Sequence, residues 1–418
     1  MCREGSADKF SAALAFQMYM GVFMRKKYKI AVGLLGAVVF LLAILGGSLY
    51  VLKANVINHK PAMEMGRDAQ HDGRQLTVDE QVEEILSDMS ITERIGQMVM
   101  VGVPGKAFDN DSRYVLGQFH YGGIILFDRN LESKDQTKKL IADLQSGANE
   151  KLPLFIAIDE EGGAVVRGES FIPAPPAAED VGKESPEFAE GLAVSLAEEL
   201  MSLGINVNFA PVADVGASEG RSYSTDPYEV LAFIKSIGNG YHSAGIIYAL
   251  KHFPGIGRGT VDSHREISSI EASEEELQKA DIMPFREMIH NTGKGKDLDY
   301  MVMVGHLKYP AFDAENAASL SRTIITDLLR NDLGYQGIVI TDDLEMGAVA
   351  NHLTFREAGL KAVQAGADIV LVCHELAHAE DAYMGIYNAL QNGQISEERI
   401  NESVRRIIKA KLTHGLTP

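Results

Sequence analysis

Short apolar runs rich in Val and Ile alternate with longer amphipathic stretches from residue 78 onward. Such runs are typical of the buried strands of a parallel sheet, and the stretches between them have a helical pattern. Eight strands are predicted, at Gln97–Gly102, Gly123–Phe127, Leu154–Ile158, Asn206–Ala210, Ile246–Leu250, Tyr300–Val304, Gly337–Ile340 and Asp368–Val372. Eight strands separated mainly by helices favour a (β/α)8 barrel, with an open doubly wound sheet as the alternative.

The N-terminal region has a different pattern. From Ile30 to Val51 the chain is almost continuously apolar and uncharged, and a helix needs roughly 20 such residues to span a bilayer. Basic residues precede this run, so the positive-inside rule places residues 1–29 in the cytoplasm and the chain after residue 51 outside. Residues 30–51 are therefore predicted to form an uncleaved transmembrane anchor in the cell membrane, with a cleaved signal peptide and secretion as the alternative.

Two further boundaries follow from the same region. Met24 opens a Met-Arg-Lys-Lys-Tyr-Lys segment that is typical of the start of a signal, so residues 1–23 are interpreted as a start-site artefact. Residues 52–77 show no sustained periodicity and are predicted to be a linker. One globular domain is predicted over residues 78–418.

Composition narrows the function. The hydrophobic share of 46% is that of a globular protein, and a formal net charge of −19 argues against nucleic acid as a partner. Cys2 and Cys373 are the only cysteines, so no disulfide framework is expected. The His residues are scattered and form no His-Glu-x-x-His motif, so neither a metal nor an organic cofactor is expected.

Polar residues follow one predicted strand after another. They are Asp159 after the third, Asp214 and Arg221 after the fourth, Lys251 and His252 after the fifth, His306 after the sixth and Asp342 after the seventh. In a barrel of parallel strands these positions share the C-terminal rim, where enzymes of this fold carry out their chemistry. The sequence therefore predicts a polar pocket on that rim.

A glycine-rich segment leaves the fifth strand. It runs from Lys251-His252-Phe253-Pro254-Gly255 to Asp262-Ser263-His264. A carboxylate two residues from an imidazole can hydrogen-bond one ring nitrogen and raise the basicity of the other.

These segments resemble glycoside hydrolase family 3, in its β-N-acetylhexosaminidase branch. The resemblance also rests on residues 334–346, 159–163, 208–214 and 221–223, and it covers roughly residues 80–412. One departure is Ile256, which stands where His is usual. The resemblance implies that Asp342 is the nucleophile and that His264, oriented by Asp262, is the acid/base in place of a second carboxylate. It implies a retaining reaction through a covalent glycosyl-enzyme.

The resemblance also implies a sugar-binding subsite. Its residues would be Asp159, Arg221, Lys251 and His252, and His306 and Met346 match further family positions, with packing of the rim as their alternative role. An ion pair between Asp159 and Arg221 is the structural alternative for those two residues. Asp214 is expected to be structural.

We therefore expect an exo-acting enzyme that releases terminal β-linked N-acetylglucosamine from peptidoglycan or muropeptide fragments outside the cell. Two alternatives stay open. One is a phosphorylase on the same fold that transfers the glycosyl group to phosphate, and the other is a non-catalytic barrel that binds cell-wall sugars. A barrel acting on phosphorylated metabolites would require a glycine-rich phosphate loop after the seventh or eighth strand, but Ala365-Gly366-Ala367 precedes the eighth strand instead.

Overall fold

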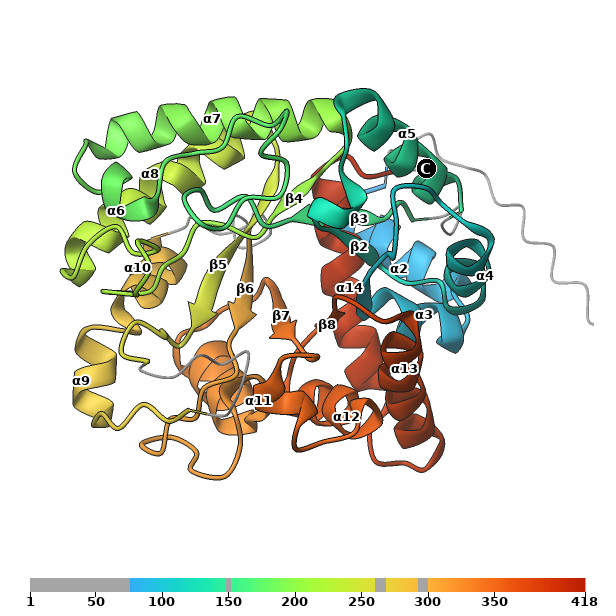
Figure 1. The fold of residues 1–418 in the computed structure, drawn as a ribbon. Coiled ribbons are helices and arrows are strands. Elements are labelled where there is room, and N and C mark those ends of the chain that lie inside the picture. The colour runs from blue at the N-terminus through green and yellow to red at the C-terminus, as the bar shows by residue number, and fades with distance from the viewer. Residues whose placement is uncertain (1–75, 148–151, 260–267, 292–299, 418) are drawn as a thin grey trace, which may run out of the picture. The chain divides into compact units, whose positions relative to one another are not determined.

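The protein forms a closed barrel of eight parallel strands in sequence order (Figure 1). The structure, a computed structural model, describes residues 76–147, 152–259, 268–291 and 300–417. The strands are β1 (Val99–Gly102), β2 (Gly123–Leu126), β3 (Phe155–Ile158), β4 (Val207–Asn208), β5 (Ile247–Phe253), β6 (Tyr300–Val304), β7 (Ile338–Asp343) and β8 (Ile369–Val372). The predicted (β/α)8 barrel and all eight predicted strands are confirmed.

Helices surround this barrel (Figure 1). The longer ones are α2 (Val78–Asp88), α4 (Asn110–Phe119), α5 (Lys134–Ser146), α7 (Pro186–Leu203), α8 (Pro227–Ala244), α10 (Met283–Asn291), η4 (Thr323–Asp332), α12 (Phe355–Ala365), α13 (Leu376–Gln391) and α14 (Glu397–Thr413). Shorter turns are α3 (Ile91–Gln97), η1 (Asp128–Asn130), α6 (Ala178–Val181), α9 (Glu274–Lys279), η3 (Ala318–Leu320) and α11 (Gly347–Ala350). Nearly every strand residue is buried, as expected for parallel strands that pack against side chains on both faces.

Strand β5 differs most from its prediction at a functionally important point. It continues through Lys251 and His252 to Phe253, which pairs with Val304 of β6 after a shift in register. Lys251 and His252 therefore lie within the strand instead of after it. Their side chains are positioned by the sheet itself.

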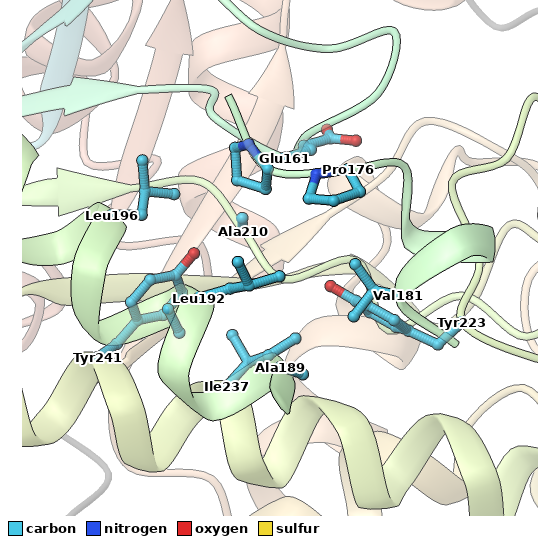
Figure 2. Close-up of a pocket in the computed structure, with 12 residues that line it drawn as sticks. Glu161, Pro176, Val181, Ala189, Leu192, Leu196, Ala210, Tyr223, Ile237 and Tyr241 are labelled. Carbon is cyan, nitrogen blue, oxygen red and sulfur yellow. The ribbon is translucent and has the colours of Figure 1, made fainter. Parts of the chain in front are cut away.

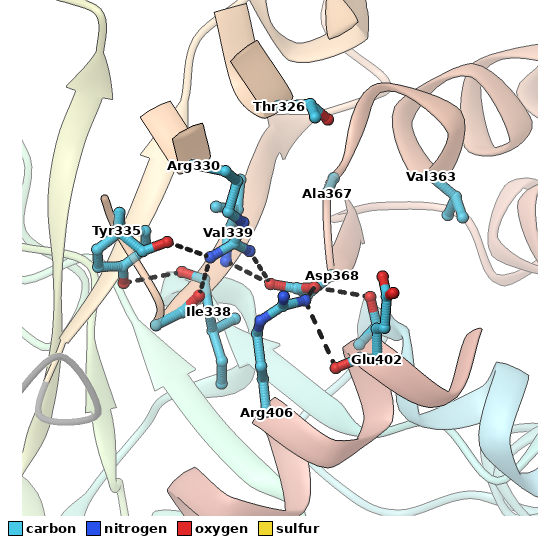
Figure 3. A network of polar contacts seen from close by, with 12 residues as sticks. Thr326, Arg330, Tyr335, Ile338, Val339, Val363, Ala367, Asp368, Glu402 and Arg406 are labelled. Atoms are coloured by element: carbon cyan, nitrogen blue, oxygen red, sulfur yellow. Dashed lines mark hydrogen bonds and ion pairs between the residues drawn. The ribbon is translucent and has the colours of Figure 1, made fainter. Parts of the chain in front are cut away.

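A network of polar contacts holds the N-terminal ends of β7 and β8 (Figure 3). Asp368, which precedes β8 and is fully buried, accepts hydrogen bonds from Arg330 of η4, from Arg406 and Ser403 of α14, and from the backbone N–H of Val339. Burial opposes ionisation of Asp368, but the surrounding guanidinium groups outweigh it and lower its pKa. The network joins two helices to the base of the barrel.

The predicted membrane anchor cannot be compared with this structure. Residues 30–51 lie outside the described residues, as do residues 1–29 and almost all of the linker at 52–77. Within the described ranges, no helix combines the length and apolar character needed to cross a bilayer. The anchor stays a prediction.

Candidate active site

A cavity of about 380 Å³ opens at the C-terminal ends of the strands. Its apolar lining includes Ile125, Phe209, Met303, Met346 and Leu371, and its charged lining includes Asp128, Arg129, Asp159, Arg167, Lys251, Asp342 and Asp343. This mixture of apolar surface and convergent polar groups is typical of a small-molecule site. Its place on the C-terminal rim is the place predicted from the sequence.

Asp342 lies in this lining near the end of β7. Its Oδ1 accepts a hydrogen bond from the N–H of Asp343 at 2.8 Å. Burial opposes ionisation of Asp342, but the electrostatic effects of the neighbouring His252 and His306 rings outweigh it, so the pKa of Asp342 is lowered. An ionised carboxylate facing a cavity is what a nucleophile at an anomeric carbon requires.

Four charged residues form what we call the rim cluster: Asp159, Glu161, Arg221 and Lys251. The Nζ of Lys251 lies 2.7 Å from Asp159 Oδ1 and 2.6 Å from Glu161 Oε1. Arg221 binds Glu161 through Nε at 2.9 Å and Nη2 at 2.8 Å. The Asp159–Arg221 ion pair that was the structural alternative is wrong, because Glu161 pairs with Arg221 and Lys251 pairs with Asp159.

Burial and pairing set the charges of the rim cluster. Burial opposes ionisation of Glu161, but Lys251 and Arg221 outweigh it and lower its pKa to about 2. Burial likewise opposes the charge of Lys251, and Asp159 and Glu161 reverse that effect and raise its pKa. Glu161 and Lys251 are therefore both charged near neutral pH.

Sequence reasoning gave no role to two residues of this region. Glu161 stood inside the family-like segment at 159–163, so its position there was a usable signal. Arg167 had no such signal, yet its guanidinium lies 3.7 Å from Asp159 and its Cζ lies 5.1 Å from the ring centroid of Phe127. Glu160, fully buried, accepts the backbone N–H of Arg167 at 2.9 Å and thereby folds this loop over the cavity.

The other predicted sugar ligands, Arg221, His252 and His306, are not among the residues that line the cavity. His252 is buried, with Nδ1 2.8 Å from Asp214 Oδ2. Both ring nitrogens of His306 are engaged within the protein, Nδ1 with Ser319 Oγ at 2.7 Å and Nε2 with the carbonyl of Asp343 at 2.8 Å. A sugar could reach His306 only by replacing one of these contacts, whereas Asp159, Lys251, Asp342 and Met346 border the cavity directly.

The predicted acid/base pair lies outside the described residues, since Asp262 and His264 fall within residues 260–267. Their role stays a prediction. The described part of the preceding loop is held at Ile256, whose N–H donates to Asp214 Oδ1 at 2.9 Å and whose side chain packs against the core. An apolar side chain at this point therefore has a packing role.

Asp343, Glu345 and His374 place one ligand atom each within 4.8 Å of one another, a spacing that would suit a metal ion. Their oxygens already serve as acceptors, however. Asp343 Oδ1 accepts the N–H of Glu345 at 3.0 Å and of Cys373 at 3.2 Å, and Glu345 Oε1 accepts from His378 at 2.6 Å. These contacts hold the segments after β7 and β8 together and explain the cluster.

A second cavity, bordered by Glu161 of the rim cluster, lies between helices α7 and α8 and the segments that follow β3 and β4 (Figure 2). It measures about 30 Å³ and is lined mainly by apolar side chains, with Glu161, Tyr223 and Tyr241 as its polar members. Its volume suits about one water molecule, so it has no room for a sugar.

Comparison with known families decides the class of protein. The family model described as the glycosyl hydrolase family 3 N terminal domain matches residues 90–410. The chain belongs to glycoside hydrolase family 3. The glycoside hydrolase class predicted from the sequence motifs is therefore confirmed.

Relatives within family 3 carry a consistent name. The β-hexosaminidase A of Pseudoalteromonas piscicida is 33% identical over 71% of this chain and 54% of its own length. The β-hexosaminidase of Tolumonas auensis is 35% identical over 70% of this chain and 86% of its own length. The chain thus spans about half of the first relative and most of the second.

Solved structures agree in fold. A family 3 β-N-acetylglucosaminidase from Paenibacillus sp. superposes with a TM-score of 0.74 at 36% identity, covering 78% of this chain and 63% of that one. The structure titled M tuberculosis LpqI superposes with a TM-score of 0.71 at 30% identity, covering 78% of this chain and 95% of that one. The predicted branch therefore agrees with the names of the two β-hexosaminidases and of the Paenibacillus enzyme.

Proposed function

We propose that this family 3 protein is a retaining β-N-acetylhexosaminidase that releases terminal N-acetylglucosamine from peptidoglycan-type saccharides. The observation that carries the proposal is the cavity on the barrel rim, in which the ionised Asp342 shares the lining with the Asp159–Lys251 pair. A carboxylate and an ammonium group together can accept from and donate to sugar hydroxyls through charge-assisted hydrogen bonds. The choice of an N-acetylated sugar rests on the name of the similar Paenibacillus structure, a β-N-acetylglucosaminidase.

The proposed chemistry proceeds in two steps. Asp342 attacks the anomeric carbon, the bond to the leaving oxygen breaks, and His264 gives that oxygen its proton. Water then attacks the same carbon, the bond to Asp342 breaks, and the water gives a proton to His264. Two inversions at one carbon leave the configuration retained.

Product analysis tests the function as a whole. The purified protein, incubated with a disaccharide of β-linked N-acetylglucosamine and N-acetylmuramic acid, should release N-acetylglucosamine, and NMR should detect its β-anomer first. The matched glucose-terminated disaccharide should react much more slowly. Initial α-anomer would overturn the retaining mechanism, and formation of the sugar 1-phosphate on adding phosphate would indicate a phosphorylase. Binding without any turnover would leave a sugar-binding barrel.

The role of His264 has a test of its own. A sugar alkoxide needs protonation to leave, whereas a nitrophenolate leaves without it. His264→Ala should therefore lower the rate of disaccharide cleavage by at least about 10²-fold. The nitrophenyl substrate should instead show a burst followed by slow turnover, because the second step loses its base. Asp262→Asn should cause smaller changes in both rates than His264→Ala, because the imidazole remains but loses its orienting carboxylate. An equal loss on both substrates without a burst would make His264 a binding residue.

We further propose that residues 30–51 anchor the enzyme in the cell membrane with the barrel outside. The support is the uncharged run itself and the basic residues that precede it. A reporter that folds only after export, fused after Pro418, should be active. Activity of a cytoplasm-only reporter at the same position would reverse the orientation and move the substrate to wall fragments inside the cell.

A further inference from the structure

The side chain of Asp214 contacts the end of β5 and the turn that follows it. It is fully buried and lies beyond β4, on a segment whose Ala213 N–H donates to the carbonyl of Lys251 at 2.7 Å. Its Oδ1 accepts the backbone N–H groups of His252 at 3.1 Å and Ile256 at 2.9 Å. Its Oδ2 lies 2.8 Å from Nδ1 of the His252 ring. The two oxygens therefore serve different purposes, one the backbone and one the imidazole.

The contact with Oδ2 determines where the ring of His252 carries its proton. A carboxylate oxygen at 2.8 Å from a ring nitrogen accepts the hydrogen bond, so Nδ1 is the donor. The other ring nitrogen, Nε2, has no hydrogen-bond partner among the described residues. It is therefore the atom of this ring that is left for a ligand.

The ring also lies close enough to Asp342 to influence it. Among the groups that favour ionisation of Asp342, His252 has the largest effect, ahead of His306 and Lys251. An imidazole near the nucleophile would be useful only with a fixed orientation, because a flipped ring or the other tautomer would present a different atom to a ligand.

We propose that Asp214 is a positioning residue for the sugar subsite, holding His252 in the Nδ1–H form so that Nε2 can accept a hydrogen bond from a hydroxyl of the N-acetylated sugar. This inference rests on the proposed function for the identity of the ligand. It assigns to Asp214 more than the structural role expected from the sequence.

Asp214→Asn separates the two roles. The amide oxygen can still accept both backbone N–H groups, so the turn from His252 to Ile256 is retained. The amide nitrogen replaces Oδ2 and can only donate, which forces Nδ1 to become the acceptor and moves the proton to Nε2. With a nitrophenyl N-acetylglucosaminide, whose leaving group needs no protonation, KM should rise by about 10-fold while kcat changes much less.

A double-mutant cycle tests whether Asp214 acts through His252. His252→Asn keeps an amide donor for Asp214 and removes Nε2, so it should raise KM to a similar extent. Adding Asp214→Asn to that variant should then have little further effect. The proposal would be overturned if the fold-increase in KM of the double variant equalled the product of the two single increases. It would also be overturned if Asp214→Asn had the KM of the wild type.

NMR of the ring nitrogens gives a readout that needs no activity. In the wild-type protein with ¹⁵N-labelled histidine, the His252 signals, assigned by their loss in His252→Asn, should report a protonated Nδ1 and an unprotonated Nε2 at neutral pH. Protonation of Nε2, alone or together with Nδ1, would overturn the proposal even if Asp214→Asn failed to fold. If the wild-type protein showed the expected form but hydrolysed no N-acetylhexosaminide, the proposed function would fail and the positioning of His252 would stand.

Discussion

Two buried charge clusters lie at opposite ends of the barrel, and they differ in what surrounds them. The rim cluster contains two carboxylates and two cations, and two of its members, Asp159 and Lys251, border the large cavity. At the other end lies what we call the base cluster: Arg330, Asp368, Arg399 and Arg406. Its carboxylate is fully buried, and its arginines also bind backbone carbonyls, as Arg330 does at Gly337.

The pKa values of the cations show the contrast. In the rim cluster, burial opposes the charges of Lys251 and Arg221, but carboxylates outweigh it and raise both pKa values. In the base cluster, burial dominates, and the pKa values of Arg330 and Arg399 are lowered although Asp368 lies between them. A ligand can thus use the rim cluster, whereas the base cluster joins helices to strands. In this fold, chemistry belongs to the C-terminal rim and stability to the N-terminal face.

The largest expected effect is a loss of activity on substitution of Asp342 at the rim. Asp342→Asn should lower kcat by at least about 10⁴-fold, because the amide cannot form the glycosyl-enzyme. The melting temperature should stay close to that of the wild type, since the side chain borders a cavity. A mechanism-based fluorosugar should label Asp342 in the wild-type protein only. Label found on another residue would contradict the assignment.

The base cluster should give the opposite result. Asp368→Asn leaves the buried Arg330 without its carboxylate, so the free energy of unfolding should fall by about 3–5 kcal/mol. KM at a temperature where the variant is folded should not change. Urea unfolding and steady-state kinetics measure the two quantities.

A matched control uses an exposed ion pair. Asp381 lies 2.8 Å from Arg356, and both side chains are about half exposed. Asp381→Asn should change the free energy of unfolding by less than about 1 kcal/mol. An equal decrease in the free energy of unfolding for Asp368→Asn and Asp381→Asn would show that the base cluster stabilises the fold no more than an exposed ion pair does.

A pH-dependent effect concerns Lys411, which is fully buried near the same end of the barrel. Its Nζ donates to Gln97 Oε1 at 2.8 Å and to the carbonyl of Gly122 at 2.9 Å, and burial lowers its pKa to about 7. The unfolded chain, with a lysine pKa of about 10.4, binds more protons between these two values. Stability contributed by this group should therefore rise with pH from about 7 upward, by up to about 1.4 kcal/mol per pH unit.

Lys411→Met should abolish that dependence. The difference in free energy of unfolding between wild type and variant should shift in favour of the wild type between pH 7 and pH 9, as measured by urea unfolding at several pH values. A difference that is constant with pH would mean that Lys411 keeps an ordinary pKa and that its hydrogen bonds compensate for burial.

The sequence pattern was most informative about the barrel and least about its pairings. Apolar runs identified all eight strands, because parallel strands buried on both faces must be apolar throughout. The end of β5 was missed because Lys251 and His252 are polar, and a polar pair reads as the end of a strand. Arg167 was missed because it follows no strand and belongs to no motif, and its place over the cavity depends on the fold of one loop around Glu160.

The amino-acid sequence by itself determined the family, the barrel and the rim on which Asp159, Lys251 and Asp342 lie, since strand periodicity and motif spacing are local properties of the chain. Only the tertiary structure decided that Glu161 pairs with Arg221 and that Asp214 binds the His252 ring. Glu161 and Arg221 are 60 positions apart in the chain, and Asp214 and His252 are 38 positions apart. The choice of partner depends on distances of a few ångströms between strand ends, and closure of the barrel alone sets those distances.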